Sequence, residues 1–334
     1  MSRSFFARRT VIAGACTVLL INACTESGSI TAPSSDATLP SASHVQEFNG
    51  RHLFHTKQFY AKSNSAKPSS NSGIFYHGGP LIVNPAVTKV VAIYWGTGTI
   101  YSGQKTGTGT GSNDATLIGS FLRNLGGSPY FNINTTYYNG AGAHVTNAVT
   151  YTGYWSTGSD VAGPKSSPTD ADMVNVISAG ISQGKIAYDA NTVYAIFTGS
   201  GINLGGGFGS QYCAYHTHGT TSAGKVVLYA AMPHNQDYPS GCTSALASPN
   251  SDVAASSEVN TLAHEIEEST TDELGTAWYD RRGYENADKC AWTWGTTHTA
   301  PNGGVYNMRL NDGNYYLIQR NWVNAGSGGC AISY

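Results

Sequence analysis

The sequence predicts an α/β fold, in which one mixed β-sheet carries packed helices and a loop-rich subdomain follows. Short apolar runs rich in Val, Ile and Tyr recur between stretches of Gly, Asn and Ser, as expected of strands and their loops. Three other stretches repeat apolar residues at the i, i+3, i+4 spacing that is typical of helices. Strands and helices follow one another along the chain, and this order favours helices packed on one sheet.

The composition indicates an exported protein that does not bind nucleic acid. Charged residues make up 11% of the 334 residues, against roughly 25% in an average globular protein. The formal net charge is −2, which gives no electrostatic reason to expect nucleic acid or an anionic membrane as a partner. With 40 Gly and 21 Tyr, the surface is polar but weakly charged, as suits an extracellular protein. We expect a monomer.

The N-terminus has the pattern of a signal peptide over residues 1–24. Three arginines within the first nine residues precede an apolar run over residues 11–21, which is too short to span a bilayer comfortably. Residues 21–24 (INAC) resemble a lipobox, so we expect Cys24 to be lipidated and to anchor an exported protein at the bacterial cell envelope. The alternatives are ordinary signal peptidase cleavage, which gives a secreted form, and a twin-arginine signal at Arg8-Arg9.

Residues 25–72 are predicted to lie outside the folded domain. Residues 25–43 are rich in Ser, Thr, Pro and Ala and are expected to form a disordered tether. Residues 44–72 hold three histidines and scattered aromatic residues without a clear period, and they either continue the tether or form a pro-segment. A single domain then spans residues 73–334.

Six strands are expected in the first part of this domain. They are residues 87–95, 130–137, 145–154, 192–197, 212–218 and 225–232. Three helices lie among and after them. The first is capped by Asn113 or Asp114, the second covers residues 168–181 with Thr169 as its N-cap, and the third begins near residues 251–252.

Four cysteines remain after the signal peptide, and in an oxidising compartment they should form two disulfides. Three pairings are open. We favour Cys213–Cys242, which brackets a hairpin-like region, and Cys290–Cys330, which follows the third helix. The second disulfide would staple a loop-rich C-terminal subdomain over residues 275–334. The chain has no Cys-x-x-Cys spacing, so a cysteine zinc site is not expected.

The third helix gives the strongest functional signal. Five of the eight Glu of the chain fall within residues 258–273. On a helix, His264 and Glu268 project from one face, one turn apart, and an apolar stripe lies on the opposite face. Two ligands one turn apart are the layout of a metalloprotease helix, although Glu268 stands where the usual motif has His. Glu265 would be the general base.

A metal at this helix needs at least one further protein ligand. Glu285 and Asp288 rank first and second, because a disulfide at Cys290 would fix their position. Asp272 ranks third, because two helical turns separate it from His264. Oxygen-rich ligands weaken the preference for zinc over Mn²⁺ or Ca²⁺, but Zn²⁺ stays the leading choice because a histidine is present.

Other interpretations compete with a catalytic metal. The acidic residues could form the solvated face of a surface helix, or hold a purely structural metal. His216 and His218 share a strand face and could join a metal site, but two exposed histidines are the commoner case. Residues 205–207 (GGG) lack the context of a nucleotide-binding loop, and no Gly-x-Ser-x-Gly motif supports a serine hydrolase.

Several short motifs resemble the phosphate-induced protein (EXORDIUM-like) family. They are Tyr76-His77-Gly78-Gly79-Pro80, the following strand with Trp95, and residues 212–219. Microbial relatives share further segments, which are here residues 263–272, 278–280 and 285–290. The resemblance implies that Glu285 and Asp288 belong with His264 and Glu268. Plant members are linked to growth and cell-wall processes and lack a recognised enzymatic activity.

The sequence therefore favours an exported metal-dependent hydrolase, with a peptidase as the leading choice. Its substrate would be a peptide or a cell-wall polymer. The order of elements, with the metal helix after the sheet and a further ligand after that helix, resembles the zincin order by analogy. The alternative is a non-catalytic surface lipoprotein that binds a cell-wall polymer or glycan through its Trp- and Tyr-rich tail.

Overall fold

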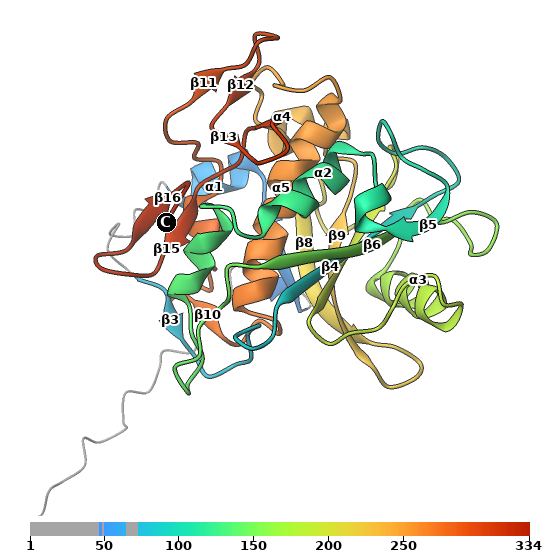
Figure 1. Cartoon of the computed structure of the whole chain (residues 1–334), viewed down its shortest axis with the longest axis horizontal. Coiled ribbons are helices and arrows are strands. Elements are labelled where there is room, and N and C mark those ends of the chain that lie inside the picture. The colour runs from blue at the N-terminus through green and yellow to red at the C-terminus, as the bar shows by residue number, and fades with distance from the viewer. Residues whose placement is uncertain (1–46, 49, 65–72) are drawn as a thin grey trace, which may run out of the picture. The chain divides into compact units, whose positions relative to one another are not determined.

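The computed structural model describes residues 47–48, 50–64 and 73–334, so the signal peptide and Cys24 lie outside the described residues. Eight strands form one mixed sheet (Figure 1). They are β1 (Glu47–Phe48), β2 (Arg51–His55), β4 (Thr88–Trp95), β5 (Gly107–Thr110), β6 (Val149–Ser156), β7 (Thr192–Thr198), β8 (Tyr212–Thr220) and β9 (Val226–Met232). Their order in the sheet is β1-β2-β8-β9-β7-β4-β6-β5. The four central strands from β9 to β6 run parallel, and the other strands pair antiparallel.

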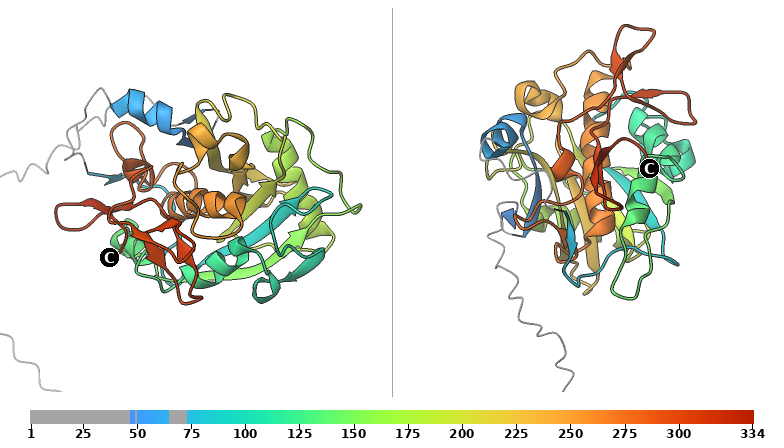
Figure 2. Two further views of the ribbon diagram at one scale, coloured as in Figure 1. Left: turned by 90° about the horizontal axis from the view of Figure 1, so that it is seen from above. Right: turned by 90° about the vertical axis from the view of Figure 1, so that its left-hand side faces the viewer.

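Helices cover both faces of this sheet, because its central strands are apolar on both sides. The long helices are α2 (Leu117–Leu125), α3 (Asp170–Ser182) and α5 (Val253–Thr271). Alternate residues of β4 enter two separate cores. Val90, Ala92 and Tyr94 pack with α2 and α5, whereas Val91, Ile93 and Trp95 pack with α3. Figure 2 shows α5 between the sheet and the C-terminal hairpins.

The remaining elements are short. The helical ones are α1 (Lys57–Asn64), α4 (Pro239–Cys242), η1 (Gly111–Asn113), η2 (Phe131–Thr136), η3 (Asn235–Asp237) and η4 (Asp288–Cys290). Strand β3 (Phe75–Tyr76) pairs with β10 (Trp278–Tyr279), and three hairpins follow. They are β11 (His298–Thr299) with β12 (Val305–Tyr306), β13 (Met308–Arg309) with β14 (Tyr315–Tyr316), and β15 (Asn321–Val323) with β16 (Gly329–Ala331).

Most of the expected elements are present, and two local predictions are wrong. Helix α3 begins after Thr169, which forms a capping box, and α5 begins after Asp252. Helix α2 is capped by Thr116 rather than by Asn113 or Asp114. The strand expected at residues 130–137 is instead the 3₁₀ helix η2. Its partly exposed residues are three apart, which is the period of a 3₁₀ helix and not of a strand.

Residues 51–64 form a strand and a helix, which differs from the tether that is one of the two predictions for them. Strand β2 pairs antiparallel with β8, with His52 opposite His216. Leu53 and Phe54 of β2 are buried. Residues 51–55 are thus part of the main sheet. Their alternative assignment to a pro-segment stays a prediction.

Both favoured disulfides are present. Cys213–Cys242 joins β8 to α4, and Cys290–Cys330 joins η4 to β16. Two disulfides indicate an oxidising compartment, in agreement with export. Within the described ranges, no helix is long and apolar enough to cross a membrane.

Candidate metal centre

The C-terminal part of helix α5 is buried on all sides. From Glu258 to Thr271 every residue is buried, and the side chains of His264, Glu265 and Glu268 are fully shielded from solvent. Strands β8 and β9 pack against the helix, and the hairpin strand β14 also contacts it. The acidic residues are therefore not the solvated face of a surface helix.

The first group of potential ligands joins α5 to η4. His264 Nε2 lies 3.1 Å from Glu268 Oε1 and 3.5 Å from Asp288 Oδ1. The backbone N–H of Asp288 donates a hydrogen bond to Glu268 Oε1 (3.0 Å), and the disulfide at Cys290 anchors the same turn. One ligand atom from each of the three side chains lies within 4.8 Å of the others, so these residues could hold a metal ion.

The second group joins α5 to β8. His216 Nδ1 lies 3.1 Å from Glu265 Oε2 and 3.6 Å from Glu268 Oε2. The expectation that His216 and His218 are both exposed is wrong for His216, which is 1% exposed, and right for His218. The cause is the position of His216 in the sheet, where it lies between β2 and β9 and faces α5.

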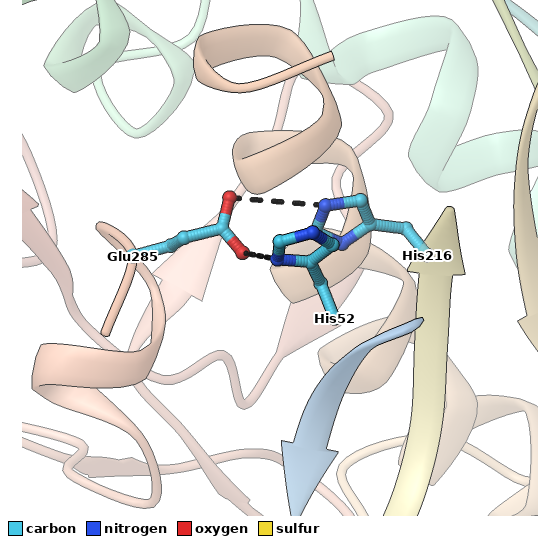
Figure 3. Close-up of side chains that lie close together, drawn as sticks. All are labelled: His52, His216 and Glu285. Carbon is cyan, nitrogen blue, oxygen red and sulfur yellow. Dashed lines mark ion pairs between the residues drawn. The ribbon is translucent and has the colours of Figure 1, made fainter. Parts of the chain in front are cut away.

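The third group contains Glu285, which lies apart from His264. Glu285 Oε2 is 3.0 Å from His52 Nδ1, and Glu285 Oε1 is 3.8 Å from His216 Nε2 (Figure 3). The two imidazole rings stack with their centroids 5.0 Å apart. Of the ligands expected from the sequence, Asp288 thus lies beside His264 and Glu268, and Glu285 lies on the other side of the cluster.

Asp272 is not among the potential ligands. Its carboxylate accepts hydrogen bonds from the backbone N–H groups of Thr276, Ala277 and Trp278. It therefore fixes the turn that leads from α5 to β10.

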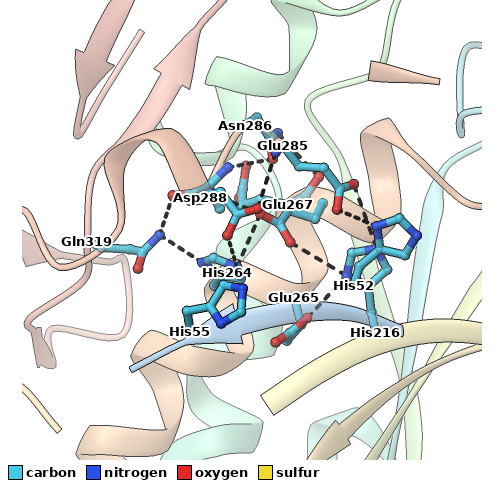
Figure 4. A network of polar contacts seen from close by, with 12 residues as sticks. His52, His55, His216, His264, Glu265, Glu267, Glu285, Asn286, Asp288 and Gln319 are labelled. Atoms are coloured by element: carbon cyan, nitrogen blue, oxygen red, sulfur yellow. Dashed lines mark hydrogen bonds and ion pairs between the residues drawn. The ribbon is translucent and has the colours of Figure 1, made fainter. Parts of the chain in front are cut away.

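Further side chains orient the cluster (Figure 4). Gln319 Nε2 lies 3.0 Å from His264 Nδ1 and donates to the carbonyl oxygen of Ala287. The hydroxyl of Tyr60 donates to Asp288 Oδ1, and the ring of Phe54 lies 4.1 Å from the ring of His264.

The orientation of the Gln319 amide decides the tautomer of His264. When Nε2 of Gln319 donates to Nδ1, the proton of the neutral imidazole is on Nε2, facing Glu268. Turning the amide by 180° would let Gln319 Oε1 accept from Nδ1–H and would leave Nε2 open to a metal, but it would break the hydrogen bond to Ala287 and bring two carbonyl oxygens together.

The family of the chain follows from a sequence comparison. The profile described as "Phosphate-induced protein 1 conserved region" matches residues 74–331. The chain belongs to the phosphate-induced protein 1 family. No curated protein matches the chain, and no solved structure matches it. The likeness to the zincin order therefore stays a prediction.

The phosphate-induced protein 1 region supplies most, but not all, of the cluster. All ligands of the first two groups lie within residues 74–331. His52, Phe54 and Tyr60 precede that region.

Burial dominates the electrostatics of this centre. It raises the pKa of Glu265 well above its ordinary value, and the neighbouring Glu268 and Asp288 raise that pKa further. Burial likewise raises the pKa of Glu268 and of Glu285, and it lowers the pKa of His264 to about 4.

The side chains of this centre fit a bound cation. Among the residues that the structure describes, no Lys or Arg forms an ion pair with Glu265, Glu268 or Glu285. Glu265 Oε1 and Glu268 Oε2 are buried and accept no hydrogen bond from that part of the chain. Such oxygens are costly to bury unless a proton or a cation offsets their charge.

Sequence reasoning named His216 as a possible member of a metal site but favoured an exposed pair with His218, and it missed other members of the cluster. His52, Tyr60 and Gln319 lie in stretches without periodicity, and only the tertiary structure brings them to α5.

Proposed function

We propose that this chain is an exported metal-dependent hydrolase that cleaves peptide bonds. The observation on which the proposal depends is the buried group His264, Glu268 and Asp288 beside Glu265. A histidine and two carboxylates can bind a divalent cation and leave one position for substrate or water. The adjacent carboxylate of Glu265 is held by His216 through one oxygen only.

A cation bound there would polarise the substrate carbonyl and make water a better nucleophile at neutral pH. Glu265 would accept a proton from the water that attacks the carbonyl carbon. It would then pass the proton to the amide nitrogen as the C–N bond breaks. Because burial raises the pKa of Glu265, the cation has a second effect: its charge favours the ionised carboxylate that a base requires.

Zn²⁺ is the proposed ion, since the group contains an imidazole. Its carboxylates would also accept Mn²⁺ or Ca²⁺, which prefer oxygen ligands. His264 fits Zn²⁺ only with the Gln319 amide turned.

The test compares the hydrolysis of unfolded casein by the wild-type protein and by Glu265→Gln. We expect hydrolysis that a chelator abolishes and Zn²⁺ restores. Glu265→Gln should keep its bound metal but lose activity by about 100-fold or more. Glu273→Gln, a partly buried Glu just beyond the same helix, is the matched control and should retain activity. Full activity in Glu265→Gln would refute the role of this residue.

A non-catalytic surface protein that binds a cell-wall glycan is the second candidate. The observation in its favour is a set of partly exposed aromatic side chains on the C-terminal hairpins, in which Tyr306 and Tyr315 contact each other edge to face. Aromatic rings of this kind stack on sugars and other flat apolar surfaces. Pulldown of cell-wall glycan by the unchanged protein, with loss of binding in Tyr306→Ala/Tyr315→Ala, would support this candidate, and undiminished binding would count against it.

A further inference from the structure

The segment over residues 50–64 covers the candidate metal centre from outside the conserved region. Strand β2 and helix α1 precede residue 74, where the match to the phosphate-induced protein 1 family begins. Figure 4 shows β2 passing across the cluster, with His52 and His55 on it. A chain segment that the family region does not include thus contributes to the buried polar cluster on α5.

The conformation of β2 is that of an extended peptide added to the edge of a sheet. It pairs antiparallel with β8, with His52 opposite His216 and Phe54 opposite Ala214. In the order β1-β2-β8, strand β8 has no other neighbour on this side than β2. Backbone pairing of this kind recognises an extended polypeptide with little regard for its sequence.

Alternate side chains of β2 point to opposite faces of the sheet, as do those of a bound peptide strand whose side chains enter pockets. Leu53 enters the core beside α3, whereas Phe54 enters the core beside α5. His52 lies 3.0 Å from Glu285, and Phe54 lies against the His264 ring. The side chains on one face of β2 therefore contact members of all three ligand groups.

Helix α1 also covers the cluster, at Asp288 of the first group. The hydroxyl of Tyr60 donates to Asp288 Oδ1, and Tyr60 is 6% exposed. Backbone contacts hold the turn before α1, where the N–H of Thr56 donates to the carbonyl oxygen of Gln211.

We infer that residues 50–64 occupy a peptide-binding groove along β8, and that an extended polypeptide with an aromatic side chain at the Phe54 position binds in their place. In this arrangement the segment is an internal ligand that closes the site. The inference of a groove depends on the pairing of β2 with β8. That the exchanged peptide is also a substrate rests on the proposed hydrolase function.

The experiment cuts the full chain between the segment and the conserved region. Residues 66–71 are replaced by the recognition sequence of a specific protease, and the cut protein is mixed with a fluorescent synthetic peptide of residues 47–64. We expect the cut protein to keep its thermal unfolding transition and to bind the peptide saturably, whereas the uncut protein does not bind it. The Phe54→Ala peptide should bind at least ten-fold more weakly.

A second variant tests the register of the bound peptide. A Cβ at Gly275 would lie 1.9 Å from His52 Nε2, so Gly275→Ala forces this imidazole to move, and the positive φ of Gly275 strains the turn equally with either peptide. In the cut Gly275→Ala protein, the His52→Ala peptide should therefore bind more tightly than the unchanged peptide. In the cut protein with Gly275 intact, the unchanged peptide should bind at least as tightly as the His52→Ala peptide.

Two results would overturn the inference. The first is loss of the thermal transition on cutting, because residues 50–64 would then be a permanent strand of the domain. The second is a folded cut protein that takes up no peptide at hundred-fold excess over several days. Neither readout depends on bound metal or on hydrolysis, so peptide exchange in a protein that cleaves nothing would refute the proposed hydrolase and leave the groove.

Discussion

At the scale of single residues, the second contact of each ligand decides whether it can bind a metal. His264 faces Glu268 through Nε2 and Gln319 through Nδ1. A ligating imidazole needs its proton on the nitrogen that faces away from the metal, so Gln319 has to present its oxygen to Nδ1. His216 is held in the same way, with Glu265 at its Nδ1.

The role of Gln319 gives the first prediction. Gln319→Ala should weaken Zn²⁺ binding by about 10- to 100-fold, because His264 loses the partner that orients its ring. Competition with a fluorescent zinc chelator measures this change. Gln211→Ala is the control: this exposed residue contributes only its backbone carbonyl oxygen to the segment near the site, and it should bind Zn²⁺ as before. Equal affinity in both variants would show that Gln319 does not support a ligand.

At the scale of elements, helix α5 carries the buried polar cluster, and polar residues hold both of its ends. Its N-terminus is capped by Asp252, and its C-terminal turn ends on Asp272, whose side chain accepts three backbone N–H groups of the following turn. This turn carries the chain to β10 and on to Glu285 and Asp288. Asp272 therefore helps to position η4 by holding this turn, and it is not itself a potential metal ligand.

Loss of this carboxylate should destabilise the fold. Asp272→Ala leaves the buried N–H groups of Ala277 and Trp278 without an acceptor, which costs about 1–3 kcal/mol for each group. We expect the free energy of unfolding to fall by about 2–6 kcal/mol in urea titrations. Glu273→Ala, the neighbouring change at a partly buried side chain, should cost less than about 1 kcal/mol. Equal losses in the two variants would contradict the structural role assigned to Asp272.

The sequence was informative where one local pattern determines an element. Periodicity and capping predicted α3 and α5, because a capped amphipathic stretch has few alternatives. Residues 131–136 were misread because Tyr and Thr favour strands, whereas the burial there follows a helical period. The pair His264 and Glu268 was predictable from i, i+4 spacing. The approach of His52 to His216 was not predictable, since it depends on the pairing of β2 with β8, which no local signal specifies.

At the scale of the whole molecule, the centre joins segments that are far apart in the chain. Residues from β2, β8, α5 and the turn around η4 meet there, and the two disulfides restrain β8 and η4. The buried acids make this assembly unfavourable unless protons or a cation neutralise them. Stability should therefore depend on both pH and metal.

The pH dependence of the metal-free protein has a defined sign. Burial raises the pKa of Asp272 to about 7, above its value of about 4 in an unfolded chain. A group with a raised pKa in the folded state holds more protons there, so stability falls as the pH rises through that pKa. The buried Glu265, Glu268 and Glu285 act in the same direction. His264 and His216 have lowered pKa values and oppose this trend only below about pH 6.5, where an unfolded histidine is charged.

Chelator-treated protein should therefore lose stability between pH 6.5 and 8, by about 1 kcal/mol from Asp272 alone. Urea titrations at several pH values measure this loss. Zn²⁺ should reduce the slope, because a cation replaces the protons on the acids of the centre. Asp272→Asn should also reduce the slope in the metal-free protein. A metal-free protein that gains stability over this range would contradict the pKa directions.

The central claim is that His264, Glu268 and Asp288 hold a metal ion, and native mass spectrometry of the purified mature protein tests it most directly. We predict one Zn²⁺ per chain in the unchanged protein and in His218→Ala, whose histidine is exposed. Asp288→Asn, which keeps the size of the side chain but removes its charge, should lose the ion after dialysis. An unchanged protein that contains no metal and takes up none of Zn²⁺, Mn²⁺ or Ca²⁺ would contradict the claim.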